Sequence, residues 1–409
     1  MSGLLTNASK APKSPVPAHV PPGLVFDFNV YEPVTPGTDV FEAMYDLKKV
    51  APPVFWSPYN GGHWYVPDGE LAREVFTDQE TFSSQTLMLP REFNPPKGQG
   101  FTPIHMDQPE HAVYRNLLLN QLSRKTVIQM LPHMRRFTID LIERLKPLGR
   151  CDFTSEVAYP LPTETFIYLV KLPEQYHEPI KWRIADLHVI EADKARLFAE
   201  ILEILAPFVD DRLANPGDDT ITWLSQQQID GKPLAVHHIH SIVALLLIAG
   251  LGTIADTYGC IFRWLADNPE QRQWIRDNPA HMNGVVNELI RRFPVIMGGT
   301  LRLCVKDKQV GDAPVKNDDI ILATPASMNF DPEAYPDPLA VVFDRPIVHN
   351  GSFGHGPHRC AGAALSRSLL GIMIEEWLNR IPDFHVSKEK PAVQEAGVNV
   401  SYEELILEW

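Results

Sequence analysis

One cysteine of this chain stands where its thiol could do chemistry. Cys360 lies in the segment 352–366, SFGHGPHRCAGAALS, between a glycine-rich loop and an alanine-rich stretch that favours a helix. Glycine lets the backbone of such a loop approach another group closely. A thiol just before a helix N-terminus is near unpaired N–H groups and the positive end of the helix dipole, which favour the thiolate. We expect this thiolate to attack an electrophile or to bind a metal ion.

Three kinds of chemistry are compatible with Cys360, beside the inert buried role common for a single cysteine. As a nucleophile it needs a nearby base, for which His355 or His358 could serve. As a zinc ligand it has the same two histidines beside it, although a closed structural site requires a fourth ligand. As the axial ligand of a haem it needs an apolar helix on the opposite face and cations for two propionates. The chain contains candidates for all of these parts.

A long helix is the first of them. The proline-free stretch 234–268 predicts a helix of about 33 residues, long enough to cross the molecule. Its middle, LLLIAGLGTIAD, places small residues beside Thr253. Gly250 and Gly252 each weaken a helix interior by about 1 kcal/mol. They therefore indicate close approach by a ligand or a local distortion of the helix, with tight helix packing as the alternative.

A second helix should begin at Asp107-Gln108-Pro109, with the aspartate as its cap and an early proline. On this helix His111 and Arg115 are four residues apart and so share one face. They are either part of a solvated surface or a pair of donors aimed at an anionic ligand.

The elements that must position these residues are mostly helices. Residues 126–215 show helical periodicity, whereas strands are predicted only as a hairpin within 53–82 and again within 300–325. Residues 1–25 are proline-rich, so we expect a poorly ordered arm followed by a single catalytic domain over 26–409. The predicted fold class is mainly α with small β-sheets, that is, α+β.

Composition restricts the partners and the compartment. The net charge is −14 and no dense Lys/Arg block occurs, which argues against nucleic acid and against an anionic membrane as partners. The four cysteines are far apart without a CxxC pair, as in proteins of reducing compartments. The first residues give no sustained apolar run, and the most apolar stretch, 242–251, is too short to span a bilayer. We expect a cytoplasmic monomer.

Several motifs now point to one family. FGHGPHRCAG, residues 353–362, resembles the cysteine-ligand signature of the cytochrome P450 superfamily, including Phe353 and Gly354. Residues 288–291 (ELIR) are similar to its ExxR element, 343–345 (FDR) to the arginine-bearing segment that joins it, and 249–253 to its oxygen-activation segment. The matches occur in the family's order from about residue 30 onward. MDQPEHAVYR, LLLIAGLGT and NELIRRFP are most similar to the soluble bacterial type related to camphor hydroxylase.

The resemblance implies a cytochrome P450-like fold with haem b between the long helix and the Cys360 loop. Cys360 is then the iron ligand, whose electron donation favours cleavage of the O–O bond. The resemblance also assigns haem contacts, including partners of the propionates, and a buried polar network in place of a surface ion pair. The haem contacts are His111, Arg115, Arg302, Phe353, Gly354 and His358, and the network is Glu288, Arg291 and Arg345.

The chain departs from the family at one position. Family members usually place an acid directly before the threonine of the long helix, whereas this chain has Gly252 before Thr253. Cleavage of dioxygen requires two protons, for which a hydroxyl and a relaying acid are suited. We expect Thr253 to hold the oxygen while protons arrive through water near Gly252 or through Asp256.

The resemblance also indicates the substrate. Haem pockets of this kind are apolar, so we expect a small hydrophobic molecule, with a terpenoid or norisoprenoid-like compound as the working hypothesis. Gln99 falls where camphor-type enzymes offer a phenol to the substrate. The predicted pocket residues are Gln99, Phe101, Ala249, Gly250, Ile296 and Gly298, and the segment near 180–208 is a further candidate wall.

Electrons must come from another protein, because the chain has neither a GxGxxG strand–helix unit nor an iron–sulfur cysteine set. The resemblance implies a 2Fe-2S ferredoxin and an NADH-dependent ferredoxin reductase. The ferredoxin should dock near Arg115, Arg359 and Arg367.

The alternatives to this function are a peroxide-dependent oxygenase, a haem-thiolate binding protein without turnover, and a zinc or cysteine-nucleophile enzyme.

Overall fold

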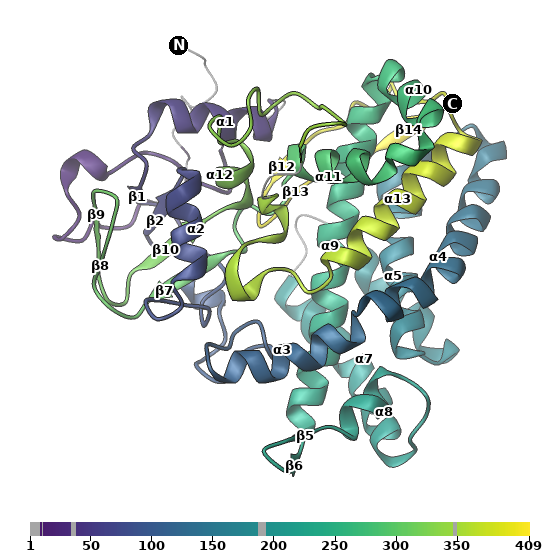
Figure 1. Cartoon of the computed structure of the whole chain (residues 1–409), viewed down its shortest axis with the longest axis horizontal. Coiled ribbons are helices and arrows are strands. Elements are labelled where there is room, and N and C mark those ends of the chain that lie inside the picture. The colour runs from purple at the N-terminus through teal and green to yellow at the C-terminus, as the bar shows by residue number, and fades with distance from the viewer. Residues whose placement is uncertain (1–8, 10, 34–37, 187–193, 347–349) are drawn as a thin grey trace.

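A computed structural model describes residues 9, 11–33, 38–186, 194–346 and 350–409 of the chain. Helices gather on one side of the molecule around the central helix α9, and the largest sheet with α1 and α2 forms the other side (Figure 1). This arrangement confirms the predicted fold class, mainly α with small sheets. The helices are α1 (Val40–Val50), α2 (Gly69–Thr77), α3 (Glu110–Gln121), α4 (Arg124–Leu145), α5 (Pro160–Val170), α6 (His177–Asp186), α7 (Lys194–Ala214), α8 (Thr220–Ser225), α9 (Val236–Asp267), α10 (Pro269–Asp277), α11 (Met282–Arg292), α12 (Pro325–Asn329) and α13 (Ala363–Arg380).

The strands form small sheets. The largest has the order β1-β2-β10-β7-β3, and a three-stranded sheet has the order β11-β14-β4. Three two-stranded ribbons pair β5 with β6, β8 with β9, and β12 with β13. The strands are β1 (Phe55–Ser57), β2 (His63–Val66), β3 (Phe82–Ser83), β4 (Arg150–Asp152), β5 (Gln228–Ile229), β6 (Lys232–Pro233), β7 (Leu301–Cys304), β8 (Lys308–Val310), β9 (Ala313–Val315), β10 (Ile320–Ala323), β11 (His385–Val386), β12 (Glu395–Ala396), β13 (Val400–Ser401) and β14 (Ile406–Glu408).

The predicted hairpin is β1 and β2, which pair antiparallel around a turn at Asn60, Gly61 and Gly62. All three turn residues have positive φ values, of 55°, 90° and 83°, which suits Asn and Gly. On one face of the hairpin Trp56 and Trp64 pack edge to face with ring centroids 5.4 Å apart. The hairpin therefore anchors the sheet through a buried aromatic pair.

Short polar side chains begin several helices by accepting hydrogen bonds from the first unpaired N–H groups. These N-cap residues are Asp39, Asp68, Ser123, Asp219 and Thr324. The prediction that Asp107 caps α3 is wrong, because its carboxylate accepts instead from the backbone N–H of Ser84 and the hydroxyl of Ser83, at 2.8 and 2.5 Å. Pro109 occupies the N-cap position.

Helix α9 is as long as predicted and contributes side chains to both large apolar clusters of the interior. Its N-terminal half packs in one apolar cluster with α5, α7 and α8, and its C-terminal half packs in another with α4, α11 and α13. By length and composition α9 is the one helix of the described residues that could cross a bilayer, yet half of its most apolar window is buried inside the protein. It runs through the middle of the fold, as the core helix of a folded domain does (Figure 1).

Part of the expected N-terminal arm packs on the sheet. The Ser14 N–H donates to the carbonyl of Pro58 at 2.7 Å, His19 pairs with Asp319 at 2.9 Å, and Val20 is buried. Residues 1–8 and 10 lie outside the described residues.

Candidate active site

A cavity of about 480 Å³ lies between α9 and the loop that carries Cys360. Its walls come from elements far apart in the chain: α3, α5, α9, α13 and the loops that contain residues 87–105, 295–300, 352–362 and 398–399. Most of the side chains that line it are apolar. A cavity with a mainly apolar lining and a few polar groups is typical of a small-molecule or cofactor site.

The backbone of the Cys360 loop is held on both sides. Gly354 and Gly356 have φ values of 68° and 67°, which favour glycine, and a Cβ on Gly356 would lie 2.5 Å from the carbonyl oxygen of Phe76. The Cys360 N–H donates to the carbonyl of Phe353 at 2.7 Å, and the Ser352 hydroxyl donates to the carbonyl of Ile290 in α11 at 2.6 Å. The loop thereby presents the thiol to the cavity from a fixed position.

The surroundings of the Cys360 thiol act on its pKa in opposite directions. Burial raises the pKa of its thiol above the ordinary value, and the Gly362 N–H and the guanidinium groups of Arg115, Arg359 and Arg367 only oppose this effect. The expected stabilisation of the thiolate by the helix N-terminus is therefore outweighed by desolvation. A bound metal cation deprotonates a coordinating thiol outright.

Two histidines and two arginines gather at one edge of the cavity. The rings of His111 and His358 stack with centroids 3.8 Å apart, and His358 donates to the carbonyl of Met106. Arg302 is buried on β7, and Arg115 donates to the carbonyl of Arg359. All four residues line the cavity.

The electrostatics of this edge indicate an anionic ligand. Burial, with the neighbouring guanidinium groups, lowers the pKa of His111 to about 4 and that of His358 to about 2, and burial lowers the pKa of Arg302 to about 10. The Nε2 atom of His111 is enclosed without a hydrogen-bond partner in the described part of the chain. A dianionic group would neutralise the guanidinium groups of Arg115 and Arg302 and accept a hydrogen bond from that nitrogen. The residues present thus fit the two propionates of a haem, for which Cys360 would be the thiolate ligand.

The zinc hypothesis finds no such support. In the described residues no three side chains of His, Cys, Asp or Glu come together as a metal site would need. His358 stacks on His111 instead of turning toward Cys360.

Helix α9 forms the wall opposite the thiol. Ala249, Gly250 and Thr253 line the cavity, and the Thr253 hydroxyl donates to the carbonyl of Ala249 at 3.0 Å, which leaves its oxygen available as an acceptor. Gly252 and Asp256 are not among the lining residues. The buried Asp256 carboxylate accepts from the Tyr159 hydroxyl at 3.3 Å and from Nδ2 of Asn399 at 2.7 Å.

The predicted substrate contacts divide into two groups. Phe101, Ala249, Gly250 and Ile296 line the cavity, as does Met88 from the same loop as Phe101.

Gln99 and Gly298 do not line it, in contrast to the prediction. Gln99 is exposed in a turn that its N–H closes onto the carbonyl of Pro96. Gly298 packs against Tyr31, whose ring would be 2.5 Å from a Cβ at that position. Of the candidate wall near 180–208, residues 187–193 lie outside the described residues.

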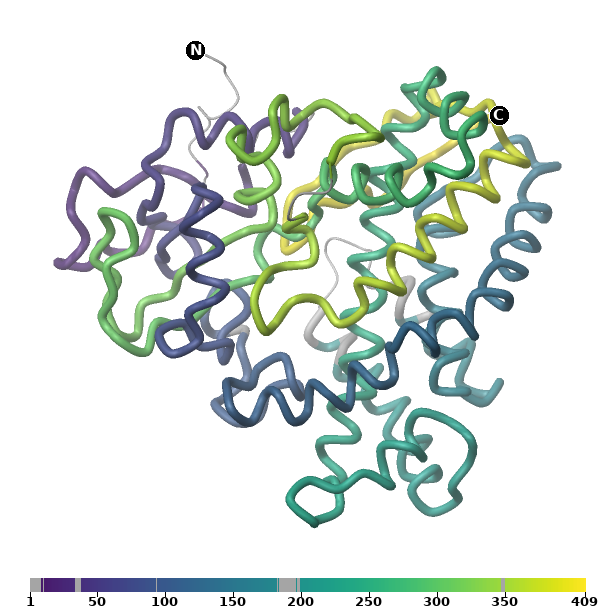
Figure 2. The backbone as a smooth tube through the Cα atoms, viewed as in Figure 1, coloured from purple at the N-terminus to yellow at the C-terminus, as the bar shows by residue number. Residues whose placement is uncertain are grey.

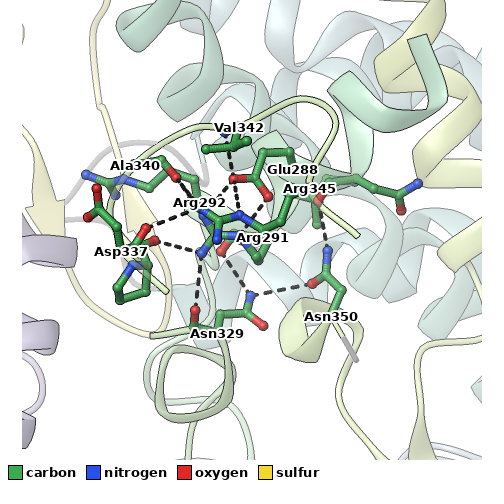
Figure 3. A network of polar contacts seen from close by, with 12 residues as sticks. Glu288, Arg291, Arg292, Asn329, Asp337, Ala340, Val342, Arg345 and Asn350 are labelled. Atoms are coloured by element: carbon green, nitrogen blue, oxygen red, sulfur yellow. Dashed lines mark hydrogen bonds and ion pairs between the residues drawn. The ribbon is translucent and has the colours of Figure 1, made fainter. Parts of the chain in front are cut away.

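The predicted network of Glu288, Arg291 and Arg345 forms between α11 and the segment 329–345 (Figure 3). Arg291 donates to both carboxylate oxygens of Glu288 at 2.8 and 2.9 Å, and Nε of Arg345 donates to the same carboxylate at 3.1 Å. Glu288 and Arg291 are buried, so this is a structural network and not a surface ion pair. Carbonyls of Asn329, Pro338 and Ala340 accept the remaining donors of Arg291.

Two of the three arginines near the Cys360 thiol are engaged by other residues and so are less available to a docking partner than the sequence indicated. Arg367 donates to Asn287 at 2.7 Å and packs over the Phe353 ring at 4.3 Å, and Arg115 is tied to the carbonyl of Arg359. Of these three arginines, Arg359 is the exposed one.

Sequence reasoning missed two polar residues of the cavity wall. His105 accepts the Phe101 N–H on Nδ1 at 3.1 Å, and Asn399 reaches Asp256 from the C-terminal segment. Neither belongs to a motif. An Asn in an otherwise apolar stretch, GVNV, was the available signal for the second.

Comparison with known proteins gives a consistent result. A cytochrome P450 family model matches residues 192–395. The chain is 29% identical to probable cytochrome P450 127A1 of Sinorhizobium fredii over 97% of each chain. It is 28% identical to erythromycin C-12 hydroxylase of Saccharopolyspora erythraea over 82% of this chain and 86% of that one.

Two crystal structures resemble the whole molecule. CYP101J2 is 30% identical with a TM-score of 0.88, over 97% of this chain and 100% of that one. CYP101C1 is 30% identical with a TM-score of 0.89, over 96% and 99%. The structure also contains the Cys360 loop, the cavity edge with Arg115 and Arg302, and the buried Glu288–Arg291 pair. The chain therefore belongs to the cytochrome P450 family and is a monooxygenase.

Proposed function

We propose that this monooxygenase hydroxylates a small hydrophobic molecule, in the class of terpenoids or norisoprenoids. The observation that carries the proposal is the apolar cavity with the Cys360 thiol on one side and the Thr253 hydroxyl on the other. The reaction is RH + O2 + 2e− + 2H+ → ROH + H2O. One oxygen atom enters a C–H bond and the other leaves as water.

The cofactor in this proposal is haem b. When bound, it supplies the iron that activates dioxygen, with Cys360 as its thiolate ligand. His111, Arg115, Arg302 and His358 would hold its propionates through charge-assisted hydrogen bonds. Support comes from the unpartnered Nε2 of His111 and from the buried guanidinium of Arg302 at the same edge.

Protons reach the cavity along α9. Thr253 is proposed to accept a hydrogen bond from water beside the reacting oxygen, because its own proton is already donated to Ala249. Asp256, one turn further on, is the proposed acid in place of the residue usual at position 252.

Electrons are proposed to come from NADH through a ferredoxin reductase and a 2Fe-2S ferredoxin, in the cytoplasm. The ferredoxin would dock on the Cys360 side near Arg359, an exposed cation on a chain of net charge −14. The chain would act as a monomer with one catalytic domain over residues 26–409. Steering by charge predicts that reduction slows as ionic strength rises.

The test combines a spectrum with turnover. The reduced, carbon-monoxide-treated protein should show the absorption band of a thiolate-ligated haem, and Cys360→Ala should abolish it while Cys304→Ala, at a buried cysteine away from the cavity, retains it. Cyclic terpenoids should then shift the spin state of the haem and yield hydroxylated product with ferredoxin, reductase and NADH. A protein without that band, or without product from any terpenoid tried, would contradict the cofactor or the substrate class, respectively.

A peroxide-dependent oxygenase is the second candidate, because Gly252 stands where an acid is usual and hydrogen peroxide brings its own protons. Product formation with peroxide that outpaces the ferredoxin-supported rate would favour it.

A further inference from the structure

The acid missing from position 252 has a counterpart one helical turn away. If Gly252 carried a Cβ, that atom would lie 3.9 Å from Oδ2 of Asp256 and 3.8 Å from Nδ2 of Asn399. Residues four apart share a helix face, so the Asp256 carboxylate reaches back to the space beside position 252. The acid is displaced along α9 and is held by a contact from another element.

That element is the C-terminal segment, which returns across the molecule and contacts α9 (Figure 2). Its backbone is fixed to the cavity wall: the N–H groups of Met297 and Gly298 donate to the carbonyl of Val398 at 2.8 and 3.0 Å, and that of Val400 donates to Val295 at 2.7 Å. Asn399 lies between these anchored residues and itself lines the cavity.

The two ends of the Asn399 amide have different tasks. An ionised carboxylate only accepts hydrogen bonds, so Nδ2 must face Asp256, at 2.7 Å. Oδ1 has no hydrogen-bond partner in the described part of the chain, and it is not among the enclosed unpaired atoms. It is therefore accessible to a water molecule in the cavity, which Asp256, outside the lining, does not reach directly.

We propose that Asn399 is a positioning residue for proton delivery: it holds the Asp256 carboxylate beside position 252 and orders water between that carboxylate and the cavity. This inference rests on the monooxygenase function proposed above. Product formation and release of hydrogen peroxide (O2 + 2e− + 2H+ → H2O2) consume the same electrons and protons. The two reactions differ in which oxygen atom takes up the second proton. The share of electrons recovered as hydrogen peroxide therefore reports on how protons are delivered.

The experiment compares Asn399→Ala, Asp256→Asn and the double variant in the haem-loaded protein with ferredoxin, reductase and NADH. Asn399→Ala should raise the peroxide share severalfold and change the solvent hydrogen isotope effect on product formation. In the Asp256→Asn background it should add nothing, because a residue that acts through a partner has no separate effect once the partner is removed. Ser401→Ala, which removes a polar group two residues along the same segment and away from the cavity lining, should match the wild type.

A second readout needs no turnover. The infrared carboxyl band that disappears in Asp256→Asn reports the protonation of this residue. Loss of the Asn399 donor should raise the pKa of Asp256, since the ionised form loses one charge-assisted hydrogen bond. Tyr159 and Cys260 are titratable groups near this carboxylate, and both are kept in every variant.

Three outcomes separate the ideas. An unchanged peroxide share in Asn399→Ala, or an effect that adds in full to that of Asp256→Asn, would overturn the inference while the wild type still forms product. A wild type that forms no product would instead refute the proposed function. If Asn399→Ala does not fold, Asn399→Ser is measured in its place. Because this variant also lacks the amide that donates to Asp256, it should show the same direction of change, and wild-type values would overturn the inference.

Discussion

At the scale of single residues, the site consists of groups whose charge the protein itself leaves uncompensated. Arg302 is buried, and its Nη1 donates to the backbone carbonyl of the preceding residue, Leu301, at 2.7 Å. Asp107, the acid that raises its pKa, is engaged by Ser83 and Ser84. Such an arrangement costs stability in the free protein and is favourable only when an anion arrives.

The uncompensated charge of Arg302 predicts that one substitution has opposite effects on the stability of the haem-free protein and on haem binding. Arg302→Met keeps the length of the side chain but removes the buried charge, so the haem-free protein should be more stable by on the order of 1 to 3 kcal/mol. Haem binding should weaken about tenfold to a hundredfold, because one charge-assisted hydrogen bond is lost. Urea unfolding of the haem-free protein and the rate of haem transfer to an acceptor protein measure the two effects.

Arg276→Met, at an exposed arginine of α10, is the control and should change neither quantity. A loss of haem-free stability in Arg302→Met would show that the guanidinium is compensated in the free protein.

At the scale of elements, α11 is joined to the segment 329–345 through the Glu288 carboxylate. That carboxylate accepts from two arginines and from the Val342 N–H at 3.0 Å (Figure 3). The Ser352 hydroxyl of the Cys360 loop donates to the carbonyl of Ile290 in the same helix. The network therefore sets the position of the loop that presents Cys360.

Glu288→Gln should destabilise the protein by about 3 to 5 kcal/mol, because it leaves the buried Arg291 guanidinium without its anion. This is a large part of the total stability of a typical domain. The free energy of unfolding in denaturant measures it. Glu80→Gln, which breaks the exposed Lys306–Glu80 pair at 3.3 Å, should cost less than about 1 kcal/mol. Equal costs for the two variants would refute the structural role of the network.

Helix α9 also holds the loop that contains Phe101 and Thr102. The Thr102 N–H donates to the Ser241 hydroxyl of α9 at 2.7 Å, and the Thr102 hydroxyl pairs with Nδ1 of His238 at 2.8 Å. Thr102 lies next to Phe101, which lines the cavity. The beginning of α9 thus fixes the loop that carries this wall.

Ser241→Ala should loosen the loop, because the buried Thr102 N–H loses its acceptor at a cost of about 1 to 3 kcal/mol. Hydrogen exchange of residues 99–106 should accelerate about fivefold to a hundredfold, with little change elsewhere. Ser225→Ala, which removes a hydroxyl that donates within α8, is the control. Unchanged exchange in Ser241→Ala would mean that His238 alone holds the loop.

The sequence predicted the elements better than their contacts. The hairpin, α9 and the Cys360 loop follow from local signals, namely turn residues, proline spacing and glycines with positive φ. Gln99 was misplaced because a local turn onto Pro96 leaves it exposed. Asp107 was misplaced because its carboxylate binds Ser83 and Ser84, more than 20 residues earlier in the chain. The contact of Asn399 with Asp256 joins residues 143 apart, which no local pattern encodes.

At the scale of the whole molecule, buried histidines couple the fold to pH. Burial lowers the pKa of His63 and of His105 to about 4, and burial together with the Arg115 and Arg302 guanidinium groups does the same for His111. Each is neutral in the folded protein above that value, whereas an unfolded histidine takes up a proton near pH 6.5. Above pH 6.5 both states are neutral and full stability is present. Between pH 6.5 and 4 only the unfolded state binds the proton, so stability falls as the pH falls.

His63 gives the sharpest test, because it is fully buried and away from the cavity, with Nδ1 donating to the carbonyl of Tyr59 at 3.3 Å. Each pH unit below 6.5 should cost about 1.4 kcal/mol for this residue, or on the order of 3 kcal/mol by pH 4. In His63→Gln, which does not titrate, the free energy of unfolding should fall less steeply between pH 6.5 and 4.5 than in the wild type. His281→Gln, at an exposed histidine, should keep the wild-type slope. Identical slopes for His63→Gln and the wild type would show that His63 is already protonated in the folded protein or opens to solvent before the molecule unfolds.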